Sequence, residues 1–144
     1  MENKSKVGKI GELLWIREFG GKQSDDAFDQ ECDVFLDDKK IEIKTQVRFY
    51  KENAFTVDKN QLQKCLGWPN LKKGFGAQFL HFVEYDLCTP IITFWECSDR
   101  FDYRELSNGR IAWDISKMTK IKEIQDVESS MQLQQNTSSR YRAN

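Results

Sequence analysis

The sequence has a single histidine, no closely spaced pair of cysteines, no long apolar run and almost no net charge. Because His81 is the only histidine, a mechanism that needs two histidines from one chain is excluded. Its place inside an apolar segment is more typical of a hydrogen-bonded core histidine than of a catalyst. The four cysteines form no Cys-x-x-Cys pair and predict free thiols in place of a zinc site. They are Cys32, Cys65, Cys88 and Cys97.

Targeting and membrane signals are also missing. No apolar run approaches the roughly 20 residues that span a bilayer. Residues 1–20 contain neither the apolar segment nor the cleavage site of a signal peptide. We therefore expect a cytoplasmic protein without membrane contact. The formal net charge of −1 argues against coating nucleic acid by bulk electrostatics, but it is compatible with a local basic groove.

Length and composition predict one folded domain. A chain of 144 residues is long enough for a single core, and ten Phe and four Trp indicate a packed aromatic interior. We expect this domain to span residues 1–128. Residues 129–144 are rich in Gln, Asn and Ser and poor in apolar residues, a composition typical of disorder, so a disordered polar tail is expected there.

The most informative stretch runs from Lys40 to Val47. Apolar and polar residues alternate along it, which predicts a strand with one apolar face and one polar, ionisable face. A polar face that simply meets solvent is the common alternative for such a strand. The apolar row is Ile41, Ile43, Thr45 and Val47, and the polar row is Glu42, Lys44 and Gln46.

The preceding segment, residues 33–36, is predicted to be the partner strand of a hairpin. A connecting loop with an even number of residues places Asp33 on the face of Glu42 and Lys44, opposite Lys44, and buries the apolar side chains of the segment. An odd loop would turn Asp33 toward the core. In the even register the two acidic residues lie about 7–8 Å apart, near enough to bind one hard cation.

An Asp followed by Glu-x-Lys at the end of a hairpin resembles the PD-(D/E)xK nuclease superfamily, which includes restriction endonucleases and archaeal-type Holliday-junction resolvases. The resemblance implies that Asp33 and Glu42 hold Mg²⁺, for which Mn²⁺ can substitute, and that Lys44 assists the attacking water. The Ile43 carbonyl would be a further oxygen ligand. The chain departs from the name-giving pattern at Cys32, where a Pro would stand, a position that varies in the family.

The resemblance also implies an α/β fold with a restriction-endonuclease-like αβββαβ core, a mixed central sheet flanked by helices. The sequence signals for these elements cover residues 7–96. They are an amphipathic helix over 7–19 ended by Gly20-Gly21, the hairpin, a strand over 54–57, a helix over 59–66, and apolar strands over 77–83 and 90–95.

Beyond this core, the sequence predicts a C-terminal hairpin and a short last helix. Asn108-Gly109 is a type I′ turn signal between two short strands. The spacing of Ile115, Met118, Ile121 and Ile124 predicts the helix.

Other site residues follow from the resemblance or from their place in the chain. The resemblance implies Glu12, on the flank of the first helix, as a third acidic ligand, with a solvated helix charge as the alternative. It implies a role at the active site for Gln61, for which an ordinary polar helix residue is an equal alternative. The predicted substrate contacts are Gln46, Arg48, Lys59 and Ser24.

We therefore expect an Mg²⁺-dependent endonuclease that hydrolyses DNA phosphodiester bonds, with junctions and other recombination or repair intermediates among its candidate substrates. A catalytically weak DNA-binding subunit of a recombination complex and an RNA-cleaving nuclease are the alternatives that the sequence leaves open. A homodimer is expected because two sites related by a two-fold axis would cut both strands. The surface around Trp113 is the candidate contact, and no small-molecule cofactor is expected.

Overall fold

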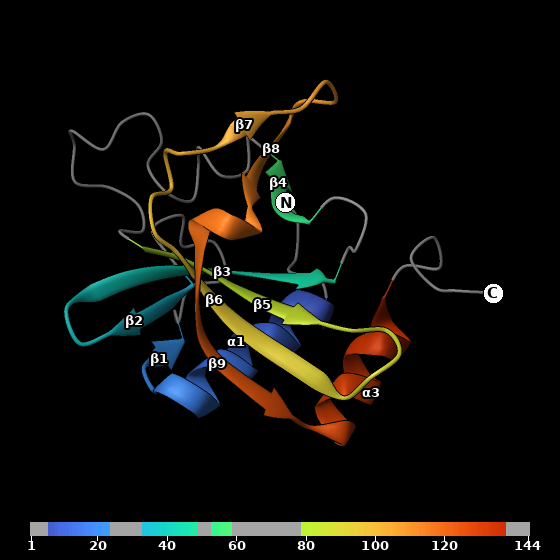
Figure 1. The fold of residues 1–144 in the computed structure, drawn as a ribbon. Helices are drawn as coiled ribbons and strands as arrows, with labels where there is room; N and C mark the ends of the chain where they lie inside the picture. The colour runs from blue at the N-terminus through green and yellow to red at the C-terminus, as the bar shows by residue number, and fades with distance from the viewer. Residues whose placement is uncertain (1–5, 24–32, 49–52, 59–78, 138–144) are drawn as a thin grey trace.

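The computed structural model describes residues 6–23, 33–48, 53–58 and 79–137 of the chain. These residues form an α/β fold with a mixed six-stranded sheet, a three-stranded sheet and two α-helices (Figure 1). Both helices cover one face of the large sheet, and the small sheet packs against the other. The α/β class predicted from the sequence is confirmed at this level.

The large sheet has the strand order β1-β2-β3-β5-β6-β9, in which β3 and β5 are parallel and the other neighbours antiparallel. Its strands are β1 (Lys22–Gln23), β2 (Val34–Leu36), β3 (Lys39–Val47), β5 (Phe79–Tyr85), β6 (Ile91–Cys97) and β9 (Met118–Gln125). The small sheet, ordered β4-β8-β7, contains β4 (Ala54–Asp58), β8 (Arg110–Asp114) and β7 (Arg104–Glu105). The helices are α1 (Lys6–Phe19) and α3 (Val127–Asn136), and η2 (Ile115–Lys117) is a 3₁₀ turn.

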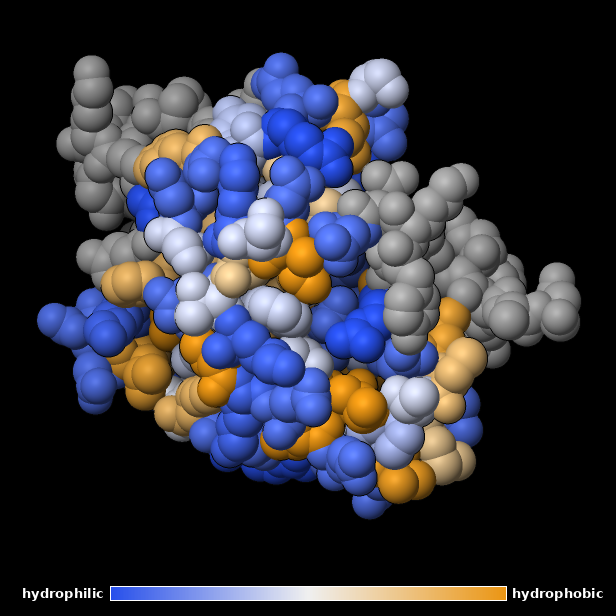
Figure 2. All heavy atoms as spheres, in the orientation of Figure 1, coloured by the Kyte–Doolittle hydropathy of each residue, from blue (hydrophilic) through white to orange (hydrophobic). Residues whose placement is uncertain are grey.

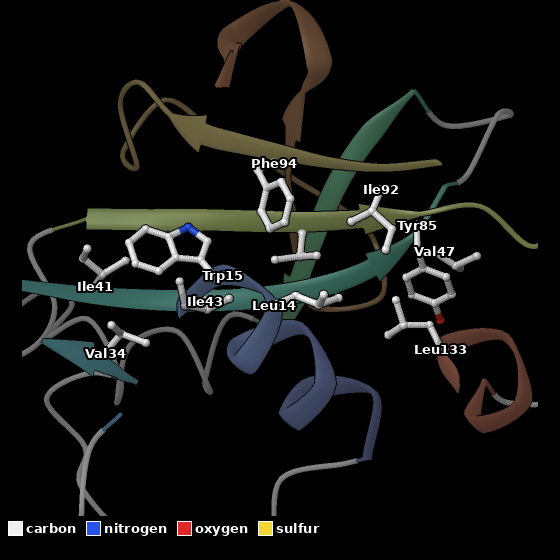
Figure 3. Packing of buried hydrophobic residues seen from close by; sticks show 11 residues of the cluster. Leu14, Trp15, Val34, Ile41, Ile43, Val47, Tyr85, Ile92, Phe94 and Leu133 are labelled. Carbon is white, nitrogen blue, oxygen red and sulfur yellow. The ribbon is translucent and has the colours of Figure 1, made fainter. Parts of the chain in front are cut away.

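Two apolar clusters lie on opposite faces of the large sheet. The helix-side cluster contains Leu14, Trp15, Val34, Ile41, Ile43, Val47, Val83, Tyr85, Ile92, Phe94 and Leu133 (Figure 3). The sheet-side cluster contains Phe55, Val57, Leu80, Phe82, Cys97, Ile111, Trp113 and Met118. Because side chains alternate along a strand, the place of Ile41 and Ile43 in the helix-side cluster turns Glu42 and Lys44 toward the small sheet.

Helix α1 lies very close to β3, and a glycine makes this possible. A Cβ atom at Gly11 would lie 1.8 Å from Thr45 Oγ1, so no larger residue fits without moving the helix. The helix ends at Gly20 and Gly21, whose φ angles of 88° and 101° glycine adopts at low cost. The predicted first helix and its end are therefore confirmed.

The hairpin of β2 and β3 is confirmed, but its register differs from the prediction. The turn has two residues, Asp37-Asp38, and the strands pair Val34 with Ile41. The even loop length holds and buries Val34 completely. The predicted pairing of Asp33 with Lys44 is wrong, because it requires a loop two residues longer.

The third predicted strand exists as β4 but lies in the small sheet, where it pairs with β8. The parallel neighbour of β3 is β5, which begins after residues 59–78. The helix predicted over residues 59–66 lies outside the described residues. The two predicted apolar strands are confirmed as β5 and β6.

The C-terminal hairpin is confirmed as β7 and β8, with a different turn. Gly109 has a φ of 81°, and its N–H donates to the Leu106 carbonyl at 3.2 Å. Asn108 does not have the positive φ that a type I′ turn requires, so that turn type is wrong. Trp113 is fully buried and its Nε1 donates to the Arg100 carbonyl at 3.3 Å. The Trp113 side chain itself therefore lies inside the domain, and the dimer surface predicted around it stays a prediction.

The last predicted helix is wrong, because this segment forms η2 and the edge strand β9. A register shift between Phe94 and Trp95 interrupts the pairing of β6 with β9. As a result, Met118 packs in the sheet-side cluster and Ile124 against the helix-side cluster. The three-residue spacing of apolar side chains is thus explained by an irregular strand whose apolar side chains point to both faces of the sheet.

Helix α3 covers residues 127–136 and so overlaps the tail that was predicted to be disordered from residue 129. That prediction is wrong for residues 129–137, which the structure describes as ordered. Asp126 caps the helix by accepting a hydrogen bond from the Ser129 N–H at 2.9 Å. Leu133 is fully buried against the sheet, and the Thr137 hydroxyl bonds to Tyr85 of β5. Residues 138–144 lie outside the described residues.

We expect Leu133→Ala to destabilise the whole domain if α3 belongs to the fold. Removing a fully buried leucine side chain costs about 2–5 kcal/mol, through lost burial and the cavity left behind. Urea unfolding followed by circular dichroism measures this, with the exposed Met131→Ala in the same helix as control. Equal stabilities for the two variants would show that α3 does not contribute to the core.

None of the helices in the described part of the chain is long and apolar enough to cross a membrane. On the face drawn in Figure 2, the hydrophobic residues form small groups among hydrophilic ones. The predicted homodimer therefore stays a prediction, without an assigned contact surface.

Candidate active site

The carboxylates of Asp33 and Glu42 lie together beside β3. Two hydrogen bonds fix Asp33 to the residues before and after Glu42. The Asp33 N–H donates to the Ile41 carbonyl at 3.1 Å, and Asp33 Oδ2 accepts from the Ile43 N–H at 2.9 Å. The two side chains also hydrogen-bond to each other. Asp33 is 7% exposed and Glu42 only 3%, so both acids are buried.

Lys44 completes this group. Its Nζ lies 3.3 Å from Glu42 Oε2, and 17% of its side chain is exposed. Two residues apart on a strand, Glu42 and Lys44 point to the same face. The structure thus brings together Asp33, Glu42 and Lys44, although the register by which it does so differs from the predicted one.

Burial is the largest influence on Glu42. Together with the neighbouring Asp33 carboxylate, it raises the pKa of Glu42 to about 8, against the opposing effect of the Lys44 ammonium. At neutral pH Glu42 therefore keeps its proton in the metal-free protein. A second positive charge beside the pair would relieve the repulsion that retains this proton.

The chemistry of the donors fits a hard divalent cation. Two carboxylates supply oxygen ligands, which Mg²⁺ prefers. The Ile43 N–H donates to Asp33, and since the N–H and C=O of one strand residue point to the same edge, the Ile43 carbonyl also points to that edge. Within the described residues, no group of three or more His, Cys, Asp and Glu side chains could hold a metal ion.

Glu12 is buried in the structure, so only one of its two sequence interpretations is wrong. It is 2% exposed, so it is not a solvated helix charge, and its Oε1 accepts from Gln23 Nε2 of β1 at 3.2 Å. The structure does not gather it into a three-acid group with Asp33 and Glu42. A role for Glu12 as a third ligand stays a prediction.

The polar row of β3 continues with Gln46, whose side-chain amide joins the two sheets. Its Nε2 donates to the Ala54 carbonyl at 3.1 Å, and its Oε1 accepts from the Thr56 N–H at 3.0 Å. Both bonds reach β4, so Gln46 connects the strand that carries the acids to the small sheet. Its predicted contact with substrate stays a prediction.

Arg48 follows in the row and forms an ion pair with Glu84, at 3.3 Å between Nη2 and Oε1. Sequence reasoning missed Glu84 as a residue of interest. A carboxylate at the end of a predicted buried strand was the available signal, because such a group needs a partner. Ser24, Lys59 and Gln61 lie outside the described residues.

His81 lies on the other face of the sheet. It is 7% exposed and packs edge-on against Trp15, with ring centroids 5.3 Å apart. Burial, with a smaller effect of Lys39, lowers the pKa of His81 to about 4, so it is neutral at pH 7. Its interpretation as a core residue is confirmed, although Nδ1 has no hydrogen-bond partner among the described residues.

The two cysteines in the described residues are free thiols, as predicted. Burial raises the pKa of Cys97 to about 12, which leaves this thiol unreactive near neutral pH. Cys32 and Cys65 lie outside the described residues.

A scan of the chain against protein-family models and a search of curated proteins gave no match. A function for this chain therefore has to be inferred from the geometry of Asp33, Glu42 and Lys44.

The raised pKa of Glu42 predicts that the metal-free protein loses stability as the pH rises. Glu42 keeps its proton to about pH 8 when folded but loses it near 4.5 when unfolded, so unfolding releases a proton between these values. His81 has the opposite effect, only below pH 6.5. We expect the free energy of unfolding in urea to fall by about 1–2 kcal/mol between pH 6.5 and 8. A similar fall in Glu42→Gln would contradict this assignment.

Proposed function

We propose that this chain is a divalent-metal-dependent nuclease of the PD-(D/E)xK superfamily that hydrolyses phosphodiester bonds in DNA. One observation carries the proposal: the buried, mutually hydrogen-bonded carboxyl groups of Asp33 and Glu42, with the Lys44 ammonium 3.3 Å from Glu42. Stability does not require such a group, because burying two neighbouring acids costs free energy that apolar residues would not.

Asp33, Glu42 and the Ile43 carbonyl would hold Mg²⁺, and Mn²⁺ would substitute. When bound, such an ion lowers the pKa of water and offsets negative charge on the phosphate. For Glu42 to act as a ligand, its proton has to leave. The Asp33 carboxylate is already held in place by the Ile43 N–H, so little reorganisation is needed to present it.

Lys44 has a separate role in this proposal. Its ammonium lies on the face of Glu42 and is partly exposed, so it can reach a water molecule or a phosphate oxygen placed beside the acids. Donating to that water orients the nucleophile. Donating to the phosphate stabilises the negative charge that grows on the pentavalent transition state.

The fold supports the restriction-endonuclease-like class. A hairpin that carries the acids, a parallel strand beside it and a first helix across the sheet are the elements that the resemblance implies. Strand β4 departs from the expected core, because it joins the small sheet. Gln46 nevertheless keeps β4 next to the strand that bears the acids.

The direct test incubates the purified protein with Mg²⁺ or Mn²⁺ and labelled duplex, single-stranded, flap and four-way-junction DNA, with RNA in parallel. We expect metal-dependent cleavage of at least one DNA form, blocked by a chelator. Cleavage of RNA alone would favour the RNA-cleaving alternative, and binding without cleavage would favour the DNA-binding subunit. Neither binding nor cleavage of any substrate would contradict the proposal. Sedimentation with and without DNA tests the expected homodimer.

A further inference from the structure

A second cluster of charged and aromatic side chains lies beyond the acids along the sheet. Arg48 directly follows β3, and its N–H donates to the Tyr85 carbonyl at 2.7 Å, so the pairing with β5 continues to this residue. Glu84 of β5 has a side chain only 6% exposed. Its Oε1 accepts from Arg48 Nη2 at 3.3 Å and from Trp95 Nε1 of β6 at 3.2 Å. Strands β3, β5 and β6 are neighbours in the sheet (Figure 1), so this cluster joins the end of β3 to the two strands beside it.

This cluster lies on the face of the proposed active site. Glu84 is the register partner of Gln46, which follows Glu42 and Lys44 in the polar row of β3. Arg48 is four residues beyond Lys44, which is about 13 Å along an extended strand. Phosphates of one nucleic-acid strand recur at shorter intervals than this, so the two cations would meet different phosphates.

Stability does not account for the burial of Glu84. Removing a carboxylate and a guanidinium from water costs about as much as their attraction returns, and β3 and β5 are already joined by backbone hydrogen bonds. A third of the Arg48 side chain is exposed. Glu84 therefore fixes one edge of a planar cation that solvent still reaches.

We propose that Glu84 is a positioning residue that holds Arg48 for contact with a backbone phosphate other than the one that is cleaved. This inference rests on the proposed nuclease function and adds a second anchoring point for the nucleic acid. Arg48 makes the contact, while Glu84 and Trp95 act through it. Lys44 serves the chemical step, whereas this cluster determines how tightly the substrate is held.

The test measures binding of a labelled DNA duplex, and of one of its single strands, in the Glu42→Gln parent protein over a range of salt concentrations. Arg48→Ala is expected to weaken binding about tenfold and to reduce the slope of log affinity against log salt by about one. Glu84→Leu should weaken binding as much, although it removes a negative charge. Glu84→Gln keeps an oxygen acceptor and should bind nearly as the parent does. Glu84→Leu added to Arg48→Ala should have no further effect.

Two results would overturn the positioning role. One is unchanged or tighter binding by Glu84→Leu, which is what loss of an ordinary negative charge near DNA gives. The other is an additive effect of Glu84→Leu and Arg48→Ala. If Glu84→Leu does not fold, Arg48→Lys decides, because lysine keeps the charge but not the planar fork. If Glu84 positions Arg48, Arg48→Lys should lose affinity for DNA. Full DNA affinity in Arg48→Lys overturns the positioning role.

The controls separate this inference from the proposed function. In the wild-type background, Arg48→Ala should raise KM and leave kcat nearly unchanged, because the contact is remote from the cleaved bond. A parent protein that binds neither DNA form overturns this inference, and a wild-type protein that in addition cleaves no DNA form overturns the proposed function as well. A parent that binds DNA and is insensitive to changes at Arg48 and Glu84 overturns only this one.

Discussion

Replacing Glu42 by Gln is expected to abolish metal-dependent cleavage, with a loss on the order of a thousandfold or more, and to leave the fold intact. The amide has the shape of the protonated acid that the metal-free protein already contains, so no cavity forms. It cannot supply the negative charge that a divalent ion requires. Initial rates of cleavage and calorimetric titration with Mn²⁺ measure the two effects.

Glu123→Gln in β9 is the matched control for Glu42→Gln. It makes the same substitution on another strand of the same sheet, at a Glu123 side chain that is 47% exposed and lies outside the acid pair. This control should cleave at the wild-type rate, and Asp33→Asn should behave like Glu42→Gln. Wild-type cleavage by either variant of the acid pair would remove the catalytic assignment.

Replacing Lys44 by Ala is expected to slow cleavage by two to four powers of ten without loss of metal binding. Lys44 lies 3.3 Å from Glu42, so its removal takes a positive charge from beside the acids and should leave metal affinity equal or higher. DNA affinity should fall only slightly, because one phosphate contact contributes a small part of the total electrostatic binding of a duplex. Single-turnover rates at saturating Mn²⁺ separate the chemical step from binding.

Lys120→Ala on β9 is the control for this variant, because the Lys120 side chain is 52% exposed. It should have the wild-type rate. A Lys44→Ala variant that is inactive only because Mn²⁺ no longer binds would contradict the proposed role. So would a Lys44→Ala variant with full activity.

The first half of the fold could be predicted well because local patterns determine it. Alternation along β3 separates Ile41 and Ile43 from Glu42 and Lys44, and each pair lies on the expected side of the sheet. The even loop placed Asp33 on the face of Glu42 even though the predicted pairing with Lys44 was wrong, because parity alone decides which face a residue takes. Burial of the acids could not be predicted, since the covering elements come from distant parts of the chain.

The second half was harder to predict because tertiary contacts override its local signals. In β9, an irregular register turns Met118 and Ile124 to opposite faces, which hides the alternation expected of a strand. In α3, the buried residues are Ser130 and Leu133, of which only Leu133 is apolar. A hydrophobic pattern could not reveal this helix, although Asp126 as an N-cap was a usable signal.

The most direct test of the proposed metal site is proton release on Mn²⁺ binding, measured at pH 7 by calorimetry in two buffers with different ionisation enthalpies. Glu42 keeps its proton at pH 7 in the metal-free protein, because burial and the neighbouring Asp33 raise its pKa to about 8. Binding should therefore release about one proton per ion, and Glu42→Gln should bind Mn²⁺ much more weakly. Absence of binding, or equal binding without proton release in both proteins, would contradict the assignment of this acid pair as the metal site.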